Sequence, residues 1–217
     1  ISFGKLRLNY AEVGKDAPPY SILDTYNINT SFGSAALTSL PNGKNNPTLK
    51  PERTKSIEAG LEMFFLQRRI GFDVAWYQTK STDQIFNAQV SRSTGFSSKV
   101  INSGDMENTG WEITLTGAPI VKDKFRWDID VNYSANKNEV VALSEGLTNL
   151  QLGSLQGGIT INATVGEPYG TIQGTDYVYL DGHEGDAAYR VIGADGYYKR
   201  STTTDNILGN ITPDFNM

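Results

Sequence analysis

This sequence of 217 residues has no cysteine, one histidine and no long apolar run. The lack of cysteine excludes disulfide bonds and thiolate metal sites. A Ser-His-Asp triad would have to use His183, and no Gly-x-Ser-x-Gly element accompanies it. No segment approaches the roughly 18 consecutive apolar residues of a transmembrane helix. Positive charge is also in deficit, because the net charge is -5, and this argues against a nucleic-acid partner.

Start and stop features are missing as well. The chain begins with Ile-Ser-Phe-Gly, without an initiator methionine or a signal peptide, and it stops at Asp-Phe-Asn-Met. We therefore expect it to be a piece of a larger chain.

What the sequence does contain is long, unbroken alternation of apolar and polar residues. In KFRWDIDVNYS (124–134), every second residue from Phe125 to Tyr133 is apolar, and the residues between them are polar or charged. This period of two is that of a β-strand whose two faces meet different surroundings. Soluble half-buried strands usually show it over roughly 4 to 8 residues, whereas a transmembrane strand needs roughly 9 to 11. The length therefore favours a membrane barrel.

Four further segments alternate in the same way, and helical periodicity is absent over any long window. The five expected strands cover approximately residues 3–12, 53–66, 70–90, 106–118 and 124–143. Short connections at 66–69 and 118–124 alternate with long loops, which are expected at 13–50, 91–105 and 144–210. In an up-and-down sheet, this order places the short turns on one side and the long loops on the other, as in outer-membrane barrels.

We therefore predict an all-β fold, namely a segment of an antiparallel up-and-down transmembrane β-barrel with long extracellular loops. Its apolar face would meet lipid, and its polar face would meet a water-filled lumen. Two bands of outward aromatic residues would mark the membrane interfaces. They are Phe65, Phe72, Phe125 and Trp127 near the short turns, and Tyr10, Trp76, Trp111 and Tyr133 toward the long loops. The alternative is a soluble all-β binding module or enzyme with these aromatic residues in its core.

The charged, proline-rich stretch NPTLKPERT (46–54) is interpreted as the start of a strand rather than as a ligand site. Pro47 and Pro51 lack the N–H that ladder pairing needs, so pairing would begin after them.

Several motifs resemble those of TonB-dependent outer-membrane transporters. NPTLKPERTKSIEAGLE (46–62) resembles their Asn-Pro-x-Leu-Lys-Pro-Glu-x-Thr segment, and INSGDMENTGWEITL (101–115) resembles their Asn-x-Gly-x-x-x-Asn-x-Gly-x-Glu segment. FGKLRLNYAEVGKD (3–16) and LGNITPDFNM (208–217) resemble two further strand elements, the second of which opens a late strand. VGEPYGTIQGTDYVYLDG (165–182) is typical of the SusC/RagA-like branch in Bacteroidetes.

This resemblance implies a piece of a nutrient importer. The family has a plug inside a barrel of about 22 strands, and this chain resembles five of those strands and the start of a sixth. The whole protein would import oligosaccharides or peptides across the outer membrane of a Gram-negative bacterium, driven through TonB and capped by a SusD-like surface lipoprotein. It would not be an enzyme, and no cofactor is implied. A siderophore or cobalamin receptor without a lipoprotein cap is the alternative within the family.

Charged residues suggest no chemistry of their own. Six carboxylates are expected to face the lumen: Glu58, Glu62, Asp73, Glu112, Asp128 and Asp130. A glycosidase would need two carboxylates about 5 to 10 Å apart. These lie beside Lys5, Arg7 and Arg126, so mutual charge compensation is the favoured interpretation. The stretch DGHEGD (181–186) is interpreted as a solvated acidic loop.

A calcium site is not predicted either. GADGYYKRSTTTD (193–205) resembles a calcium loop at Asp195, Gly196 and Asp205, but Gly193 and Ala194 replace ligand positions. No catalytic, cofactor-binding or metal residue is therefore predicted in this chain.

Tyrosine is frequent in the last long loop. These side chains are the candidate contacts with a ligand or partner, because tyrosine gives a large contact area at a low entropic cost. The alternative is that they pack the loop against itself. The candidates are Tyr169, Tyr177, Tyr179, Tyr189, Tyr197 and Tyr198.

Overall fold

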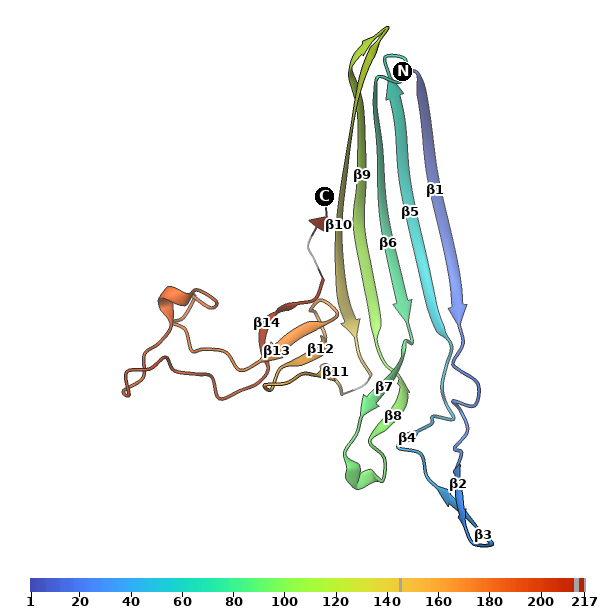
Figure 1. Ribbon diagram of the computed structural model, residues 1–217, viewed down its shortest axis with the longest axis vertical. Helices are drawn as coiled ribbons and strands as arrows, with labels where there is room; N and C mark the ends of the chain where they lie inside the picture. Colours follow the sequence, from blue (N-terminus) through green and yellow to red (C-terminus); the bar gives the residue numbers. More distant parts are fainter. Residues whose placement is uncertain (145, 213–214, 217) are drawn as a thin grey trace.

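The computed structural model describes residues 1–144, 146–212 and 215–216, and its main feature is one long antiparallel sheet (Figure 1). From one edge to the other, the sheet contains β1 (Phe3–Lys15), β5 (Glu52–Phe65), β6 (Ile70–Thr82), β9 (Asp105–Lys122), β10 (Phe125–Ala142) and β15 (Phe215–Asn216). The helical elements among the described residues are the short turns η1 (Arg92–Thr94) and η2 (Ala187–Tyr189). The prediction of an all-β antiparallel fold is confirmed. No helix in the described part of the chain is long and apolar enough to cross a membrane.

The pairing register carries the alternation across all five long strands. Residues directly opposite each other in an antiparallel pair lie on the same face. We call such a set of paired residues a rung. One rung consists of Leu6, Leu61, Val74, Ile113 and Tyr133, and the adjacent rung on the other face consists of Lys5, Glu62, Asp73, Thr114 and Asn132. The apolar residues therefore line one side of the sheet, here called the outward face, and the polar residues line the other, the wet face.

Two tight turns connect the strands at one end of the sheet, here called the turn end. Leu66, Gln67 and Arg68 link β5 to β6 with φ angles of 50°, 55° and 66°. Such left-handed conformations cost roughly 1 to 2 kcal/mol for each residue other than glycine. The turn is held because the Gln67 N–H donates to Ser2 Oγ at 2.8 Å, and the Arg68 guanidinium lies 4.7 Å from the ring centroid of Phe64. The second turn contains residues 123–124, since β9 extends beyond its expected end to Lys122.

The strand expected at 70–90 consists of two strands. β6 ends at Thr82, and β7 (Ile85–Gln89) leaves the main sheet to pair with β8 (Ser98–Asn102). Asp83 lies at the break, and its φ of 55° is incompatible with an extended strand. The N–H of Asp83 donates to Asp105 Oδ1 at 3.3 Å, which joins the break to the start of β9.

The expected loops at the opposite end, here called the loop end, contain short strands of their own. β2 (Asn27–Phe32) and β3 (Ala35–Ser39) form a hairpin, and β4 (Gly43–Lys44) adds to the edge of β8. A four-stranded sheet follows β10 and contains β11 (Asn149–Ser154), β12 (Thr160–Thr164), β13 (Thr171–Gly174) and β14 (Asn206–Asn210). Figure 1 shows β2, β3 and β4 below the long strands and β11–β14 beside the lower end of β10.

A small apolar core lies where this last sheet meets β10 and β7. Its buried residues are Ala88, Val140, Leu150 and Ala163, and Phe86 and Tyr169 are among the side chains packed against them. The motif LGNITPDFNM leads into β15, which pairs with Ser134 and Ala135 of β10. Its residues 213, 214 and 217, like residue 145 of the last expected loop, lie outside the described residues.

Candidate functional site

The wet face carries a bidentate ion pair in the middle of the sheet. Arg7 of β1 reaches across β5 and donates from both terminal nitrogens to the carboxylate of Asp73, one of them at 3.0 Å from Oδ2. Glu62 lies 3.6 Å from the same guanidinium. A Cβ at Gly60 would lie 2.8 Å from the guanidinium, so this glycine makes room for Arg7. The expected compensation of charge is therefore present for Asp73 and Glu62.

The remaining carboxylates of the predicted set lie as the alternation indicates. The register places Glu58, Glu112 and Asp130 on the wet face with Asp73. Asp128 accepts from Arg126 Nε at 2.8 Å, so this pair also compensates its own charge.

Hydrogen bonds between neighbouring strands continue the wet face toward the loop end. The hydroxyl of Tyr77 donates to Asn136 Oδ1 at 3.2 Å, and Tyr77 lies over Gly110, which has no side chain to obstruct it. Hydroxyl pairs join Thr54 to Ser81 at 3.0 Å and Ser56 to Thr79 at 3.1 Å. The face as a whole is one that water can cover, whereas the opposite face of the same strands is not.

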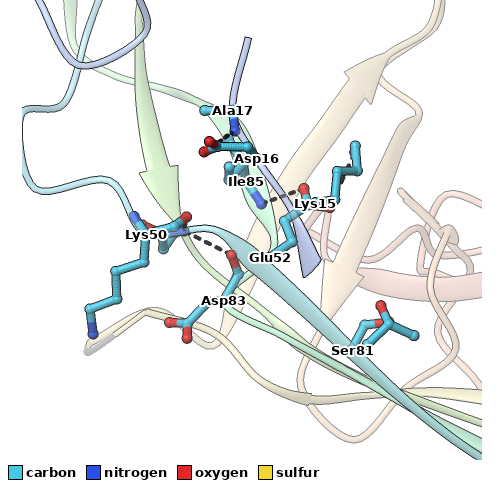
Figure 2. Close-up of polar contacts among 10 residues, drawn as sticks. Lys15, Asp16, Ala17, Lys50, Glu52, Ser81, Asp83 and Ile85 are labelled. Carbon is cyan, nitrogen blue, oxygen red and sulfur yellow. Dashed lines mark hydrogen bonds and ion pairs between the residues drawn. The ribbon is translucent and has the colours of Figure 1, made fainter. Parts of the chain in front are cut away.

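At the loop end, Glu52 and Asn102 hold strand ends together, and we call their contacts the rim clasp. Glu52 begins β5 and accepts from the N–H of Ile85 at 3.0 Å (Figure 2). It also accepts from Lys15 Nζ at 3.1 Å. Asn102 ends β8; its Nδ2 donates to the carbonyls of Lys50 and Asp83, both at 2.8 Å, and its Oδ1 accepts from the Lys50 N–H at 2.7 Å. The clasp fixes the β7–β8 hairpin over the ends of β5 and β6.

The sheet β11–β14, which we call the base, is attached to the wet face of β10 and to its edge opposite β9. Val140 exchanges backbone hydrogen bonds with the chain at Gly166 (2.8 Å) and Glu167 (3.0 Å). Asn138 lies on the wet face, accepts from the N–H of Tyr169 at 2.7 Å and donates to Thr212 Oγ1 at 3.1 Å. The base therefore covers the wet face where β10 reaches the loop end.

Residues 175–205, which we call the arm, extend from the base (Figure 1). Gly174 and Asn206 pair at its root. Beyond them, backbone bridges join Tyr177 to Arg200 and Tyr179 to Arg190. The Arg190 guanidinium lies 4.3 Å from the ring centroid of Tyr177, and the hydroxyl of Tyr179 raises its pKa. These contacts give the arm a fixed conformation even though its helix and strand content is low.

The six candidate tyrosines differ in their surroundings, and several of them pack within the chain. Tyr169 packs in the base, with its ring stacked 6.4 Å from that of Phe86, and burial raises the pKa of its hydroxyl. Tyr177 and Tyr198 meet edge to face at 5.9 Å within the arm, where Tyr179 donates to Asp176 Oδ1 at 3.2 Å. Tyr197 is 75% exposed. Contact of these residues with a ligand or partner stays a prediction.

The two stretches examined as metal sites have local roles in the arm. His183 of DGHEGD stacks on Tyr189 with a ring-centroid distance of 3.7 Å. Asp195 of GADGYYKRSTTTD accepts from the N–H of Tyr197 at 3.2 Å and so closes its own turn. The described residues contain no group of three or more His, Asp or Glu side chains placed to hold a metal ion.

Comparison with known proteins assigns the chain to a protein family. The sequence model of the family described as "TonB dependent receptor-like, beta-barrel" matches residues 2–205. The chain belongs to this family. Two TonB-dependent receptors of Formosa agariphila are 28% and 30% identical to it over 97% and 79% of the chain. The TonB-dependent receptor SusC of Bacteroides thetaiotaomicron is 30% identical over 65% of the chain. The chain spans 23%, 19% and 15% of these three relatives.

Solved structures agree with the family assignment. The structure of the RagAB peptide transporter matches 98% of the chain with a TM-score of 0.75 and 21% identity, and the chain covers 24% of the matched one. The RagAB peptide importer in its "open-open" state matches with a TM-score of 0.72. The main sheet is thus a segment of a TonB-dependent receptor barrel, and the prediction of a SusC/RagA-like member of this outer-membrane family is confirmed.

In this TonB-dependent receptor segment, two of the motifs that carry the resemblance supply the rim clasp. NPTLKPERT contributes Lys50 and Glu52, and INSGDMENTG contributes Asn102. β5 begins at Glu52, directly after Pro51, which confirms that the first motif starts a strand. Sequence reasoning did not predict the clasp, because its contacts join residues between 19 and 52 positions apart. The sequence signal that could have indicated the clasp is the position of each motif at the end or start of an alternating segment.

Proposed function

We propose that this chain forms part of a transporter in the outer membrane of a Gram-negative bacterium that imports oligosaccharides or peptides. The observation that carries the proposal is the outward face, where Leu6 and Leu8 are 68% and 72% exposed while the other face of the same strand holds Arg7 in an ion pair. Exposure of apolar surface to water costs about 25 cal/mol per Å², and contact with lipid removes that cost. In the family to which the chain belongs, this face meets the bilayer.

The substrate class is proposed from the relatives. SusC and the RagAB peptide importer are both similar to this chain. Import by a TonB-dependent receptor draws its energy through TonB, so the segment needs no catalytic residues for this role. An uncapped siderophore or cobalamin receptor is the competing outcome in the experiment below.

The arm is proposed to contact a SusD-like surface lipoprotein or the substrate. It is attached to a base that covers the wet face at the loop end, so it lies beside the mouth of the proposed lumen. The stacking of Arg190 on Tyr177 orders the arm in advance, and an ordered binding surface loses less entropy when it binds. Tyr197 and Tyr198 are 75% and 52% exposed and offer large contact areas.

Deletion of the arm from the full-length receptor tests this role. Because Gly174 and Asn206 are paired, residues 175–205 can be replaced by an Asn-Gly turn that leaves the base hairpin intact. We expect the receptor to reach the outer membrane at its normal level, while recovery of a co-purifying lipoprotein and substrate uptake both fall by at least about tenfold, as when a binding hot spot is lost.

The control is an equivalent deletion at the β2–β3 hairpin, where Asn27 and Ser39 are paired and can be joined by the same turn. This variant should retain lipoprotein and uptake. Normal lipoprotein recovery and uptake without the arm would remove the role proposed for the arm. A wild-type receptor that purifies alone and takes up an iron chelate or cobalamin would support the uncapped receptor instead. A receptor found in the soluble fraction would contradict the import proposal itself.

A further inference from the structure

The outward face changes character toward the loop end. Trp76 and Trp111 are directly paired and end the apolar part of that face on β6 and β9. Two rungs further along, the paired residues on the same face are all charged: Glu12, Lys55, Lys80, Glu107 and Glu139. Four residues of a strand span roughly 13 Å, and a strand tilted by about 40° rises roughly 10 Å over that length. The charged rung therefore lies just beyond the aromatic residues, at the depth of lipid headgroups.

Charges within this rung are unevenly paired. Lys55 of β5 and Lys80 of β6 are directly opposite each other, and like charges in this position destabilise a sheet. Lys80 is neutralised from its other side by Glu107, at 2.9 Å. Glu12, which is opposite Lys55, lies instead 3.7 Å from the guanidinium of Arg53. Within the described part of the chain, the side chain of Lys55 makes no hydrogen bond or ion pair.

Three cations are thus gathered on one exposed patch. Arg53 and Lys55 lie two residues apart on the outward face of β5, next to Lys80 on β6. The side chains of Arg53 and Lys80 are 67% and 59% exposed, and long cationic side chains on a barrel wall can extend along it to reach an anion. Below the patch, the same two strands present Ile57 and Trp76, which are suited to acyl chains rather than to water.

We propose that Arg53, Lys55 and Lys80 bind the phosphate of a membrane-lipid headgroup in the leaflet that surrounds the loop end. The phosphate would lie between the two facing lysines and supply the anionic partner that the side chain of Lys55 lacks within the described residues. The continuity of the patch with the apolar surface below it favours a lipid over free phosphate, because one molecule can satisfy both surfaces. This inference rests on the proposed location of the chain in an outer membrane.

Neutralising Lys55 tests the proposal without breaking a side-chain hydrogen bond or ion pair of the described residues. The full-length receptor, purified in a neutral detergent, is titrated with a phosphorylated glycolipid, and the bound lipid is counted by native mass spectrometry. We expect Lys55→Gln to weaken retention about fivefold, the effect of about 1 kcal/mol for each lysine near an anionic surface. Lys55→Arg should retain the lipid. The Tm of the lipid-free Lys55→Gln receptor should be unchanged or raised, because repulsion from Lys80 is relieved.

Lys137 provides the matched control, since it lies on the outward face of β10, is 78% exposed and pairs with Glu139 at 3.0 Å. Lys137→Gln should retain lipid within about twofold of the wild type. Equal retention by Lys55→Gln and the wild type would overturn the proposal. So would equal binding of a dephosphorylated glycolipid, or full displacement of lipid by an equal concentration of inorganic phosphate. A receptor absent from the outer-membrane fraction would instead contradict the proposed function. The comparison of lipid retention among variants tests only the lipid site, so the two failures can be distinguished.

Discussion

Gly110 of β9 shows how closely single residues are constrained on the wet face. A Cβ at this position would lie 2.5 Å from the hydroxyl end of the Tyr77 ring and 2.8 Å from the carbonyl oxygen of Ala135. We expect Gly110→Ala to displace Tyr77, to break its hydrogen bond to Asn136 and to lower the free energy of unfolding by about 1 to 3 kcal/mol. Urea unfolding of the full-length receptor in lipid vesicles measures this change.

Gly117→Ala is the control for that substitution. Gly117 lies on the same strand, and a Cβ there would meet no atom within 4 Å. Its cost should stay below about 0.5 kcal/mol. Equal losses for the two variants would contradict a steric cause at Gly110 and would point to a general intolerance of β9 to substitution.

At this scale, the sequence predicts the face of a side chain better than its partner. Alternation places Arg7, Glu62 and Asp73 on one face, and the expectation of charge compensation follows from their mixed signs. The bidentate contact of Arg7 with Asp73 spans 66 positions and depends on the pairing register of three strands. No single strand contains that register, so the contact could not be predicted from the residues alone.

Among the structural elements, the rim clasp is where one side chain holds several together. Asn102 at the end of β8 makes three hydrogen bonds, two to the backbone of Lys50 and one to the carbonyl of Asp83. Asn102→Ala should leave these backbone groups without their partner and cost about 1 to 3 kcal/mol. Hydrogen exchange at the amides of β7 and β8 should speed up, while exchange in the centre of β9 should stay slow.

The matched variant is Asn87→Ala, on the exposed side of β7. The side chain of Asn87 makes no hydrogen bond within the described part of the chain, so exchange rates in this variant should resemble those of the wild type. If Asn102→Ala also left exchange unchanged, the clasp would have no role in holding the hairpin.

Long elements and short ones differ in how far the sequence predicts them. Strands β1, β5, β9 and β10 follow from unbroken alternation, because each must satisfy two different surroundings along its whole length. The break at Asp83, where the chain leaves the main sheet, falls in the polar stretch 78–84, so no apolar position marks the end of β6 or the start of β7. The strands of the base are too short for alternation to be distinctive, and their buried Asn162 and Gln173 resemble loop residues in the sequence. Their hydrogen bonds to neighbouring side chains form only once the base has folded.

The molecule as a whole is organised by depth as well as by face. The turn end, the apolar rungs, the paired Trp76 and Trp111, the charged rung and the loop-end sheets follow one another along the same strands. A soluble sandwich also needs one apolar face, but it has no reason to place a charged rung beyond an aromatic one on that face. The order of the rungs therefore favours a bilayer. In a bilayer, the free-energy cost of a charged substitution on the outward face depends on the depth of the substituted residue.

Three arginine substitutions on β9 test the effect of depth and the effect of the face in the full-length receptor. Ile113 lies in the middle of the apolar rungs, next to Val74 and Tyr133. Ile113→Arg should therefore cost about 2 to 4 kcal/mol, and Thr109→Arg, on the same face nearer the loop end, about 0 to 1 kcal/mol. Thr114→Arg, on the wet face directly opposite Asp73, should cost less than about 1 kcal/mol. The measurement is the folded fraction after insertion into lipid vesicles across a urea series. Comparable losses for Ile113→Arg and Thr109→Arg would indicate a dry protein core instead of a bilayer, because a protein core has no gradient of polarity along the strand.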